Sequence, residues 1–127
     1  MELTFENIDF ADNNILEMKF SSNYNSLIID VENGFLISDK KWLGKTKIII
    51  NNWKKLILEN YISESQQTEK IDWKEEFYSL EMIQETIVEK DFVSLSGFDK
   101  KRKGWLTYRF ENCEYLIVAE IVHKNRR

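Results

Sequence analysis

The sequence predicts one mainly β domain over residues 1–127, an antiparallel sandwich or a strongly curved sheet with one or two short helices. Apolar residues come in short runs rich in Ile, Val, Phe, Tyr and Trp, the side chains that pack best on a pleated surface. Many such runs follow one another at short intervals, which is typical of sandwiches. Proline is absent and glycine occurs four times in 127 residues, so no linker divides the chain. An α+β arrangement is the alternative fold class.

The apolar runs define the expected strands and, through their alternation, the expected core. The strands are 2–6, 15–20, 26–32, 35–38, 46–51, 53–61, 86–89, 91–96, 104–110 and 115–123. Because every second side chain of a strand faces the same way, one face of each run can be assigned to the interior. The predicted core residues are Leu27, Ile29, Ile48, Ile50, Leu56, Leu106, Tyr108, Phe110, Ile117 and Ala119.

Polar turn residues between consecutive strands predict three hairpins. The turns and the strands they join are Asn33-Gly34 between 26–32 and 35–38, Asn51-Asn52 within 46–61, and Glu111–Glu114 between 104–110 and 115–123. The last strand is apolar on both faces for most of its length. This pattern predicts a central rather than an edge strand.

One stretch has a helical rather than a strand period. Its apolar residues recur at intervals of four, three and three and are Trp73, Phe77, Leu80 and Ile83. Asp72 precedes them as a candidate helix cap, and acids follow in the first turn, where the helix dipole favours them. The sequence therefore predicts a helix over 73–84. The competing interpretation places Leu80 and Met82 on a strand.

Known catalytic and metal-binding patterns are missing from the sequence. Cys113 is the only cysteine and His123 the only histidine, so one chain cannot assemble a closed zinc site of Cys and His ligands. Four scattered glycines do not form a phosphate-binding loop. Among 22 acidic residues no pair is singled out for acid–base chemistry. We therefore expect no enzymatic activity, no cofactor and no metal.

The cysteine count and the N-terminus predict a cytoplasmic protein. A single cysteine cannot form an internal disulfide, which fits a reducing compartment. The N-terminal residues include several acids and form neither the basic nor the apolar region of a secretory signal. No apolar run approaches the roughly 18 residues of a membrane helix, so no membrane association is expected.

Charge is segregated along the chain, whose formal net charge is -4. Residues 1–38 and 59–91 are acidic, the second block with ten acids and three lysines. Residues 39–58 and 92–127 are basic. Such blocks predict a surface with regions of opposite sign. The simpler interpretation is that the charges only solvate exposed positions.

The acidic block from 59 to 91 is the predicted partner-binding surface. It combines carboxylates, which steer a basic partner toward the chain, with tyrosines that anchor protein interfaces. The predicted contact residues are Glu64, Glu69, Asp72, Glu75, Glu76, Tyr61 and Tyr78. Trp73 and Phe77 lie in the same block and are expected in the core instead.

A second surface is basic and supports an alternative function. Its lysines interleave with tryptophans in Lys40-Lys41-Trp42 and Trp53-Lys54-Lys55, and Lys100-Lys101-Arg102-Lys103 adds charge. Lysines beside aromatic rings suit a nucleic-acid or small-ligand binding module. The chain is net acidic, however, so nucleic acid is not the expected partner. A homo-oligomer that pairs exposed strand edges is the second alternative.

Three stretches together resemble a family of bacterial proteins. They are Leu3–Asn7, Val93–Phe98 and Gly104–Asn112, where Gly104-Trp105-Leu106-Thr107-Tyr108-Arg109-Phe110 leads into Glu111-Asn112. The pattern resembles the small, acidic, β-rich immunity proteins of interbacterial toxin systems, including contact-dependent inhibition. The resemblance implies a cytoplasmic protein that binds and blocks one cognate toxin domain, often a basic nuclease. It carries no contact residues over, because the binding faces of these proteins diverge quickly.

Overall fold

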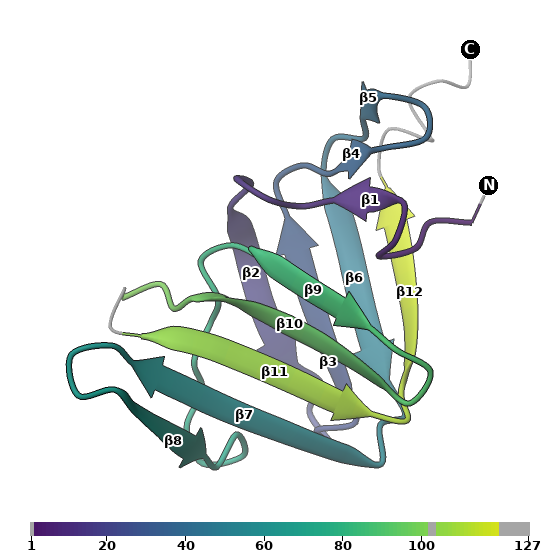
Figure 1. The fold of residues 1–127 in the computed structure, drawn as a ribbon. Helices are drawn as coiled ribbons and strands as arrows, with labels where there is room; N and C mark the ends of the chain where they lie inside the picture. Colours follow the sequence, from purple (N-terminus) through teal and green to yellow (C-terminus); the bar gives the residue numbers. More distant parts are fainter. Residues whose placement is uncertain (1, 102–103, 120–127) are drawn as a thin grey trace.

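The computed structural model describes residues 2–101 and 104–119, which form three antiparallel sheets (Figure 1). The two larger sheets pack face to face as a sandwich, and their strands cross steeply (Figure 1). The small third sheet lies at one end, at the top of Figure 1. The prediction of a mainly β sandwich is confirmed.

The first large sheet has five strands. Its spatial order is β8 (Gln67–Ile71), β7 (Lys55–Ile62), β11 (Trp105–Glu111), β10 (Phe92–Phe98) and β9 (Glu85–Val88). β10 and β11 form a hairpin in which Phe92 pairs with Glu111 and Phe98 with Trp105. β11 then pairs with β7 across more than forty residues of sequence, so the sheet depends on long-range contacts.

The second large sheet has four strands and the third has three short ones. The four-stranded order is β12 (Glu114–Ala119), β6 (Thr46–Asn51), β3 (Ser26–Val31) and β2 (Ile15–Phe20). The small sheet has the order β1 (Ile8–Asp9), β4 (Phe35–Leu36) and β5 (Lys41–Trp42). A register shift between Ile15 and Glu17 bends β2 where it pairs with β3.

The core lies between the two large sheets and contains every core residue that the sequence predicts. All ten are less than 9% exposed, with Leu56 the most accessible at 7%. The interior side chains of β3 and β6 are fully buried, as are those of β11. Strand alternation therefore identified the inward faces correctly, even where the pairing of strands was predicted wrongly.

All three hairpins predicted from turn residues are wrong. At each turn the chain leaves one sheet and enters another. The two strands that flank each turn, β3 and β4, β6 and β7, and β11 and β12, are therefore not paired with each other. Asn52 and Asn112 have the positive φ angles of tight turns, 56° and 53°. The turns form as expected, but they are corners between sheets. Such a corner lets both strands bury one face in the same core.

The helix predicted over 73–84 is also wrong, and no helix occurs among residues 2–101 and 104–119. Only one turn forms at Asp72, because the chain then extends to close the gap between the two sheets. Leu80 bridges to Asp99, and Met82 bridges to Asn14 beside β2. Leu80 and Ile83 are buried in the core from this extended segment. The competing strand interpretation is therefore closer to the structure.

The strand predicted over 115–123 is an edge strand in its described part, β12, rather than a central one. Its outward side chains Leu116 and Val118 are 57% and 42% exposed. Each of the other three edges of the large sheets carries charge, for example Lys70 in β8, Glu85 in β9 and Lys19 in β2. β12 has no charged residue between Tyr115 and Ala119. Residues 120–123 lie outside the described residues.

Smaller differences occur at strands with weak apolar patterns. The run 2–6 does not form a strand, because Thr4 and Asn7 close a turn through the Asn7 amide and the Thr4 carbonyl oxygen at 3.2 Å. β1 begins at Ile8 instead. β5 and β8 were not predicted, since their side chains are almost all exposed and show no apolar alternation.

Candidate functional site

The segment 72–78 follows β8 and forms a single turn that displays carboxylates. The Asp72 carbonyl oxygen accepts hydrogen bonds from the amides of Glu75 and Glu76 at 3.0 and 2.9 Å. Asp72 Oδ1 accepts another from the Lys74 amide at 3.1 Å. Asp72 therefore caps this turn as a helix cap would, although no helix follows. The side chains of Asp72, Glu75 and Glu76 are exposed.

Trp73 fixes this turn to the body of the protein. Its indole Nε1 donates a hydrogen bond to the Leu56 carbonyl oxygen at 3.1 Å. Its ring packs against those of Phe20 and Trp53, with centroid distances of 5.0 and 5.8 Å. Trp53 in turn packs on the buried Phe110 ring at 5.4 Å. The aromatic contacts thus run from the core to the surface, so the turn has a rigid base.

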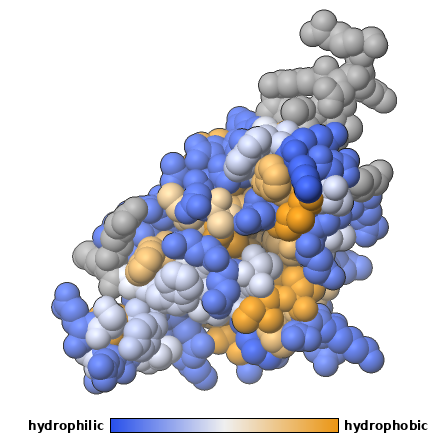
Figure 2. Space-filling view, turned by 45° about the horizontal axis from the view of Figure 1, so that its top comes forward, coloured by the Kyte–Doolittle hydropathy of each residue, from blue (hydrophilic) through white to orange (hydrophobic). Residues whose placement is uncertain are grey.

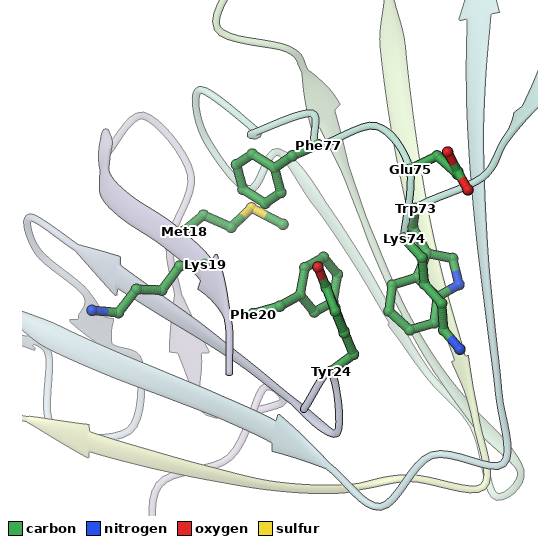
Figure 3. A pocket seen from close by; sticks show the side chains of 8 residues that line it. All are labelled: Met18, Lys19, Phe20, Tyr24, Trp73, Lys74, Glu75 and Phe77. Carbon is green, nitrogen blue, oxygen red and sulfur yellow. The ribbon is translucent and has the colours of Figure 1, made fainter. Parts of the chain in front are cut away.

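An aromatic cleft opens beside Trp73 between the β2–β3 turn and the segment 72–78 (Figure 3). We define it by Phe20, Tyr24, Trp73 and Phe77; its volume is about 380 Å³. Figure 3 shows the Phe20 and Tyr24 rings side by side and the Met18 side chain directed toward Phe77. Tyr24 is 45% exposed and Phe77 48%. The expectation that both Trp73 and Phe77 belong to the core holds only for Trp73, which is partly buried against it.

Tyr78 bonds to the carboxylate of Glu76 in the turn and lies in the field of Glu69, the one acid of β8. Its hydroxyl donates a hydrogen bond to Glu76 Oε2 at 2.7 Å. This bond, followed by burial and by the charges of Glu76, Glu69 and Asp99, raises the pKa of Tyr78 above its ordinary value. The backbone carbonyl of Tyr78 accepts a hydrogen bond from the buried Tyr108 hydroxyl. The structure therefore brings Glu69, Glu76 and Tyr78 together.

Two predicted contact residues lie apart from this group. Tyr61 is on β7, where it pairs with Thr68 and Trp105 and is 41% exposed. Its neighbour Asn60 pairs with Glu69, so Tyr61 and Glu69 project from opposite faces of the sheet. Glu64 lies in the turn between β7 and β8. The seven predicted residues therefore divide between the segment 72–78 with Glu69, the outer sheet face and the hairpin turn.

Sequence reasoning missed Phe20 and Tyr24, the half of the cleft that comes from the end of β2 and from the β2–β3 turn. Tyr24 has a positive φ of 58° inside a run of Ser and Asn residues. A large aromatic residue at the tip of a polar turn has no core to enter. That position was the available signal for an exposed ring.

Metal-ligating and nucleophilic side chains are sparse in the rest of the described structure. Within residues 2–101 and 104–119 no group of three or more His, Cys, Asp or Glu side chains could hold a metal ion. Burial raises the pKa of the Cys113 thiol, which lowers its reactivity. His123 lies outside the described residues. The part of the chain that the structure describes also has no helix long and apolar enough to cross a membrane.

The surface has no single large apolar region on the face seen in Figure 2. Hydrophobic patches there are separated by hydrophilic groups (Figure 2). The chain matches no protein-family model, no curated protein and no solved structure. The site must therefore be interpreted from its own geometry. That geometry is a set of exposed carboxylates next to two half-exposed rings on a rigid base.

Proposed function

We propose that this protein is a stoichiometric inhibitor, an immunity protein that binds and neutralises a cognate basic toxin domain of a bacterial competitor. It acts in the cytoplasm and has no turnover of its own. The observation that carries the proposal is the aromatic cleft beside the exposed carboxylates of segment 72–78. The resemblance of Leu3–Asn7 and Gly104–Asn112 to immunity proteins supports the same class.

The half-exposed rings supply the area that a protein interface needs. An aromatic side chain offers about 200 Å² in total. At 45% and 48% exposure, Tyr24 and Phe77 therefore keep roughly 100 Å² each accessible. Burying that area gives about 2.5 kcal/mol per ring at 25 cal/mol per Å². A contribution of this size per ring is typical of the residues that dominate the binding energy of a protein interface.

The carboxylates orient an approaching basic partner and accelerate its association, but they contribute little of the binding affinity. Glu69, Asp72 and Glu75 are exposed and form no ion pair within the described residues. Their charge is therefore available to a basic partner. Exposed charges of this kind accelerate encounter and are screened by salt. A toxin whose substrate carries phosphate has a basic cleft, which these acids would cover.

Co-expression with a candidate toxin domain, the C-terminal domain of a secreted protein sought in the gene directly upstream, tests the proposal. We expect the wild-type chain to restore growth, and the purified pair to form a 1:1 complex. Reversing Glu69, Glu75 and Glu76 to Lys should slow association about 10-fold or more at low salt, with a smaller effect on dissociation. Phe77→Ala should mainly accelerate dissociation, because it removes buried area.

The matched control is the double reversal K40E/K41E. Both lysines are exposed at β5, at the opposite end of the sandwich from segment 72–78 (Figure 1). This variant should protect as well as the wild type. The absence of both protection and complex formation with that candidate domain would refute the proposal.

A further inference from the structure

A second hollow lies on the other side of Tyr24 and Trp73, at the corner between β6 and β7. Its volume is about 480 Å³. We call it the lysine cleft and define it by Lys54, Lys55, Lys74, Tyr24, Trp53 and Trp73. It shares Tyr24, Trp73 and Lys74 with the aromatic cleft but faces the basic corner of the chain.

The fold itself assembles this group from distant parts of the sequence. Asn52, with its positive φ, turns the chain out of β6, and Trp53 then packs inward on Phe110. The Lys54 amide donates to the Glu111 carbonyl oxygen at 2.8 Å, which fixes the start of β7. Lys54 and Lys55 are left exposed beside the turn that carries Lys74.

The charge of the cleft is opposite to that of the chain. Three lysines line it against one carboxylate, that of Asp72, in a protein of net charge -4. None of the three lysines forms an ion pair within the described residues. Asp72 Oδ1 is already engaged by the Lys74 amide. The lysine cleft therefore has a local positive charge that attracts an anion.

The rings specify what kind of anion fits. Lys74 Nζ lies 5.5 Å from the centroid of the Trp73 ring, so an ammonium group is held directly beside an aromatic surface. Among the rings of the lysine cleft Tyr24 is the most exposed, and it stands 6.2 Å from Trp73 at an interplanar angle of 65°. A ligand that uses both the charge and the rings carries a phosphate next to a flat base.

We propose that the lysine cleft binds a nucleotide unit, with its phosphate beside the lysines and its base against Tyr24 and Trp73. The volume of 480 Å³ lies in the range of small-molecule sites. The unit comes either from a free nucleotide or from a single-stranded nucleic acid. The proposal does not rest on the toxin-binding function, because its charged groups are lysines rather than carboxylates, although the two clefts share Tyr24, Trp73 and Lys74.

The structure also corrects the basic surface expected from the sequence. Trp42 lies on β5, where it packs on Phe35 at 5.0 Å, at the far end from the β6–β7 corner (Figure 1). Trp42 and Trp53 therefore do not form one nucleic-acid face. Trp73 and Lys74, which the sequence placed with the acidic block, complete the basic site instead.

Titration of the protein with two probes tests the proposal. The probes are a fluorescein-labelled dT10 strand, followed by anisotropy, and UMP, followed by tryptophan fluorescence. We expect binding at 20 mM salt that weakens as salt rises, with a log–log slope of about −2 for three lysines on a single strand. K54A/K55A should reduce the slope by about 1.4 units. Tyr24→Ala should weaken binding about 10-fold without changing the slope.

The control is K40A/K41A, which removes two lysines at β5 and should leave both affinity and slope unchanged. Binding of UMP as well as dT10 identifies a free nucleotide as a sufficient ligand, whereas binding of dT10 alone identifies a nucleic-acid strand. No binding of either probe at 20 mM salt would overturn the proposal. Equal effects of K54A/K55A and K40A/K41A on the affinity and on the salt slope would also overturn it. Protection against the toxin domain is measured separately, so the two proposals can fail independently.

Discussion

Replacing Gly97 with Ala tests how the extended segment after residue 79 closes the sandwich. Gly97 lies in β10, directly against the backbone of Met82. A Cβ at this position would lie closer than 3.0 Å to the Met82 carbonyl oxygen and 3.3 Å from its carbonyl carbon. The obstacle is backbone, so rotation of a side chain cannot relieve it. β10 and the extended segment that carries Met82 must therefore move apart.

The expected loss follows from this geometry. Overpacking by one methyl group costs roughly 1–3 kcal/mol, and a backbone obstacle places Gly97→Ala near the upper value. Alanine also lowers the conformational entropy of the unfolded chain relative to glycine, which offsets about 0.5 kcal/mol of this loss of stability. The net loss is about 2.5 kcal/mol, or about 10 °C in melting temperature for a domain of this size.

Thermal unfolding followed by circular dichroism measures this loss. Gly44→Ala is the matched control, since Gly44 has a φ of 76° and no atom within 4 Å of an added Cβ. It should lose only the roughly 1 kcal/mol of left-handed backbone strain, about 4 °C. If Gly97→Ala melts no lower than Gly44→Ala, the Met82 backbone does not lie against Gly97 as described.

Three further predictions concern the core and its link to the site. Tyr108→Phe should lower the free energy of unfolding by about 1–2 kcal/mol in a urea titration, because the Tyr78 carbonyl loses its buried donor; an unchanged midpoint would contradict that bond. Burial raises the pKa of Tyr108 above its value in the unfolded chain, so the unfolded state loses the Tyr108 proton first as the pH rises. The free energy of unfolding should therefore decline above about pH 10, and it should decline less steeply in Tyr108→Phe. Parallel pH profiles of the two proteins would refute this. Cys113 should react with a disulfide reagent at pH 7.5 at least about 10-fold more slowly in the native than in the urea-unfolded protein, and equal rates would show an unburied thiol.

Strand faces could be predicted from the sequence, whereas strand partners could not. Alternation is a local property, and it placed residues such as Ile48 and Tyr108 in the core correctly. A polar turn such as Asn51-Asn52 shows only that the chain reverses or bends. Whether β7 returns beside β6 or enters the other sheet depends on the pairing of β7 with β11. That choice is made by packing between residues far apart in sequence.

The false helix has a related cause. The spacing of Trp73 and Phe77 matches a helical face, and Asp72 does begin a turn. Trp73, however, gains a hydrogen bond to Leu56 and a set of aromatic neighbours that a continuous helix would not offer. Tertiary contacts thus override the local period. The carboxylates of the site were predictable because acids are exposed, but the cleft beside them needs the β2–β3 turn brought near in space.

The uncharged stretch Tyr115–Ala119 of the β12 edge has a consequence for how the protein behaves at high concentration. Two copies that pair β12 antiparallel about Ile117 would set Leu116 of one opposite Val118 of the other, with no charge to separate them. Natural edges normally carry a lysine or another charge to prevent this. Here only Glu114 at the start of the strand and the overall charge of the molecule oppose it. Because that charge vanishes near the isoelectric point of about 5.1, colloidal stability should be lowest in mildly acidic buffer. The substitution Leu116→Lys would place a charge on the edge itself, so that resistance to edge pairing would no longer depend on the net charge of the whole molecule.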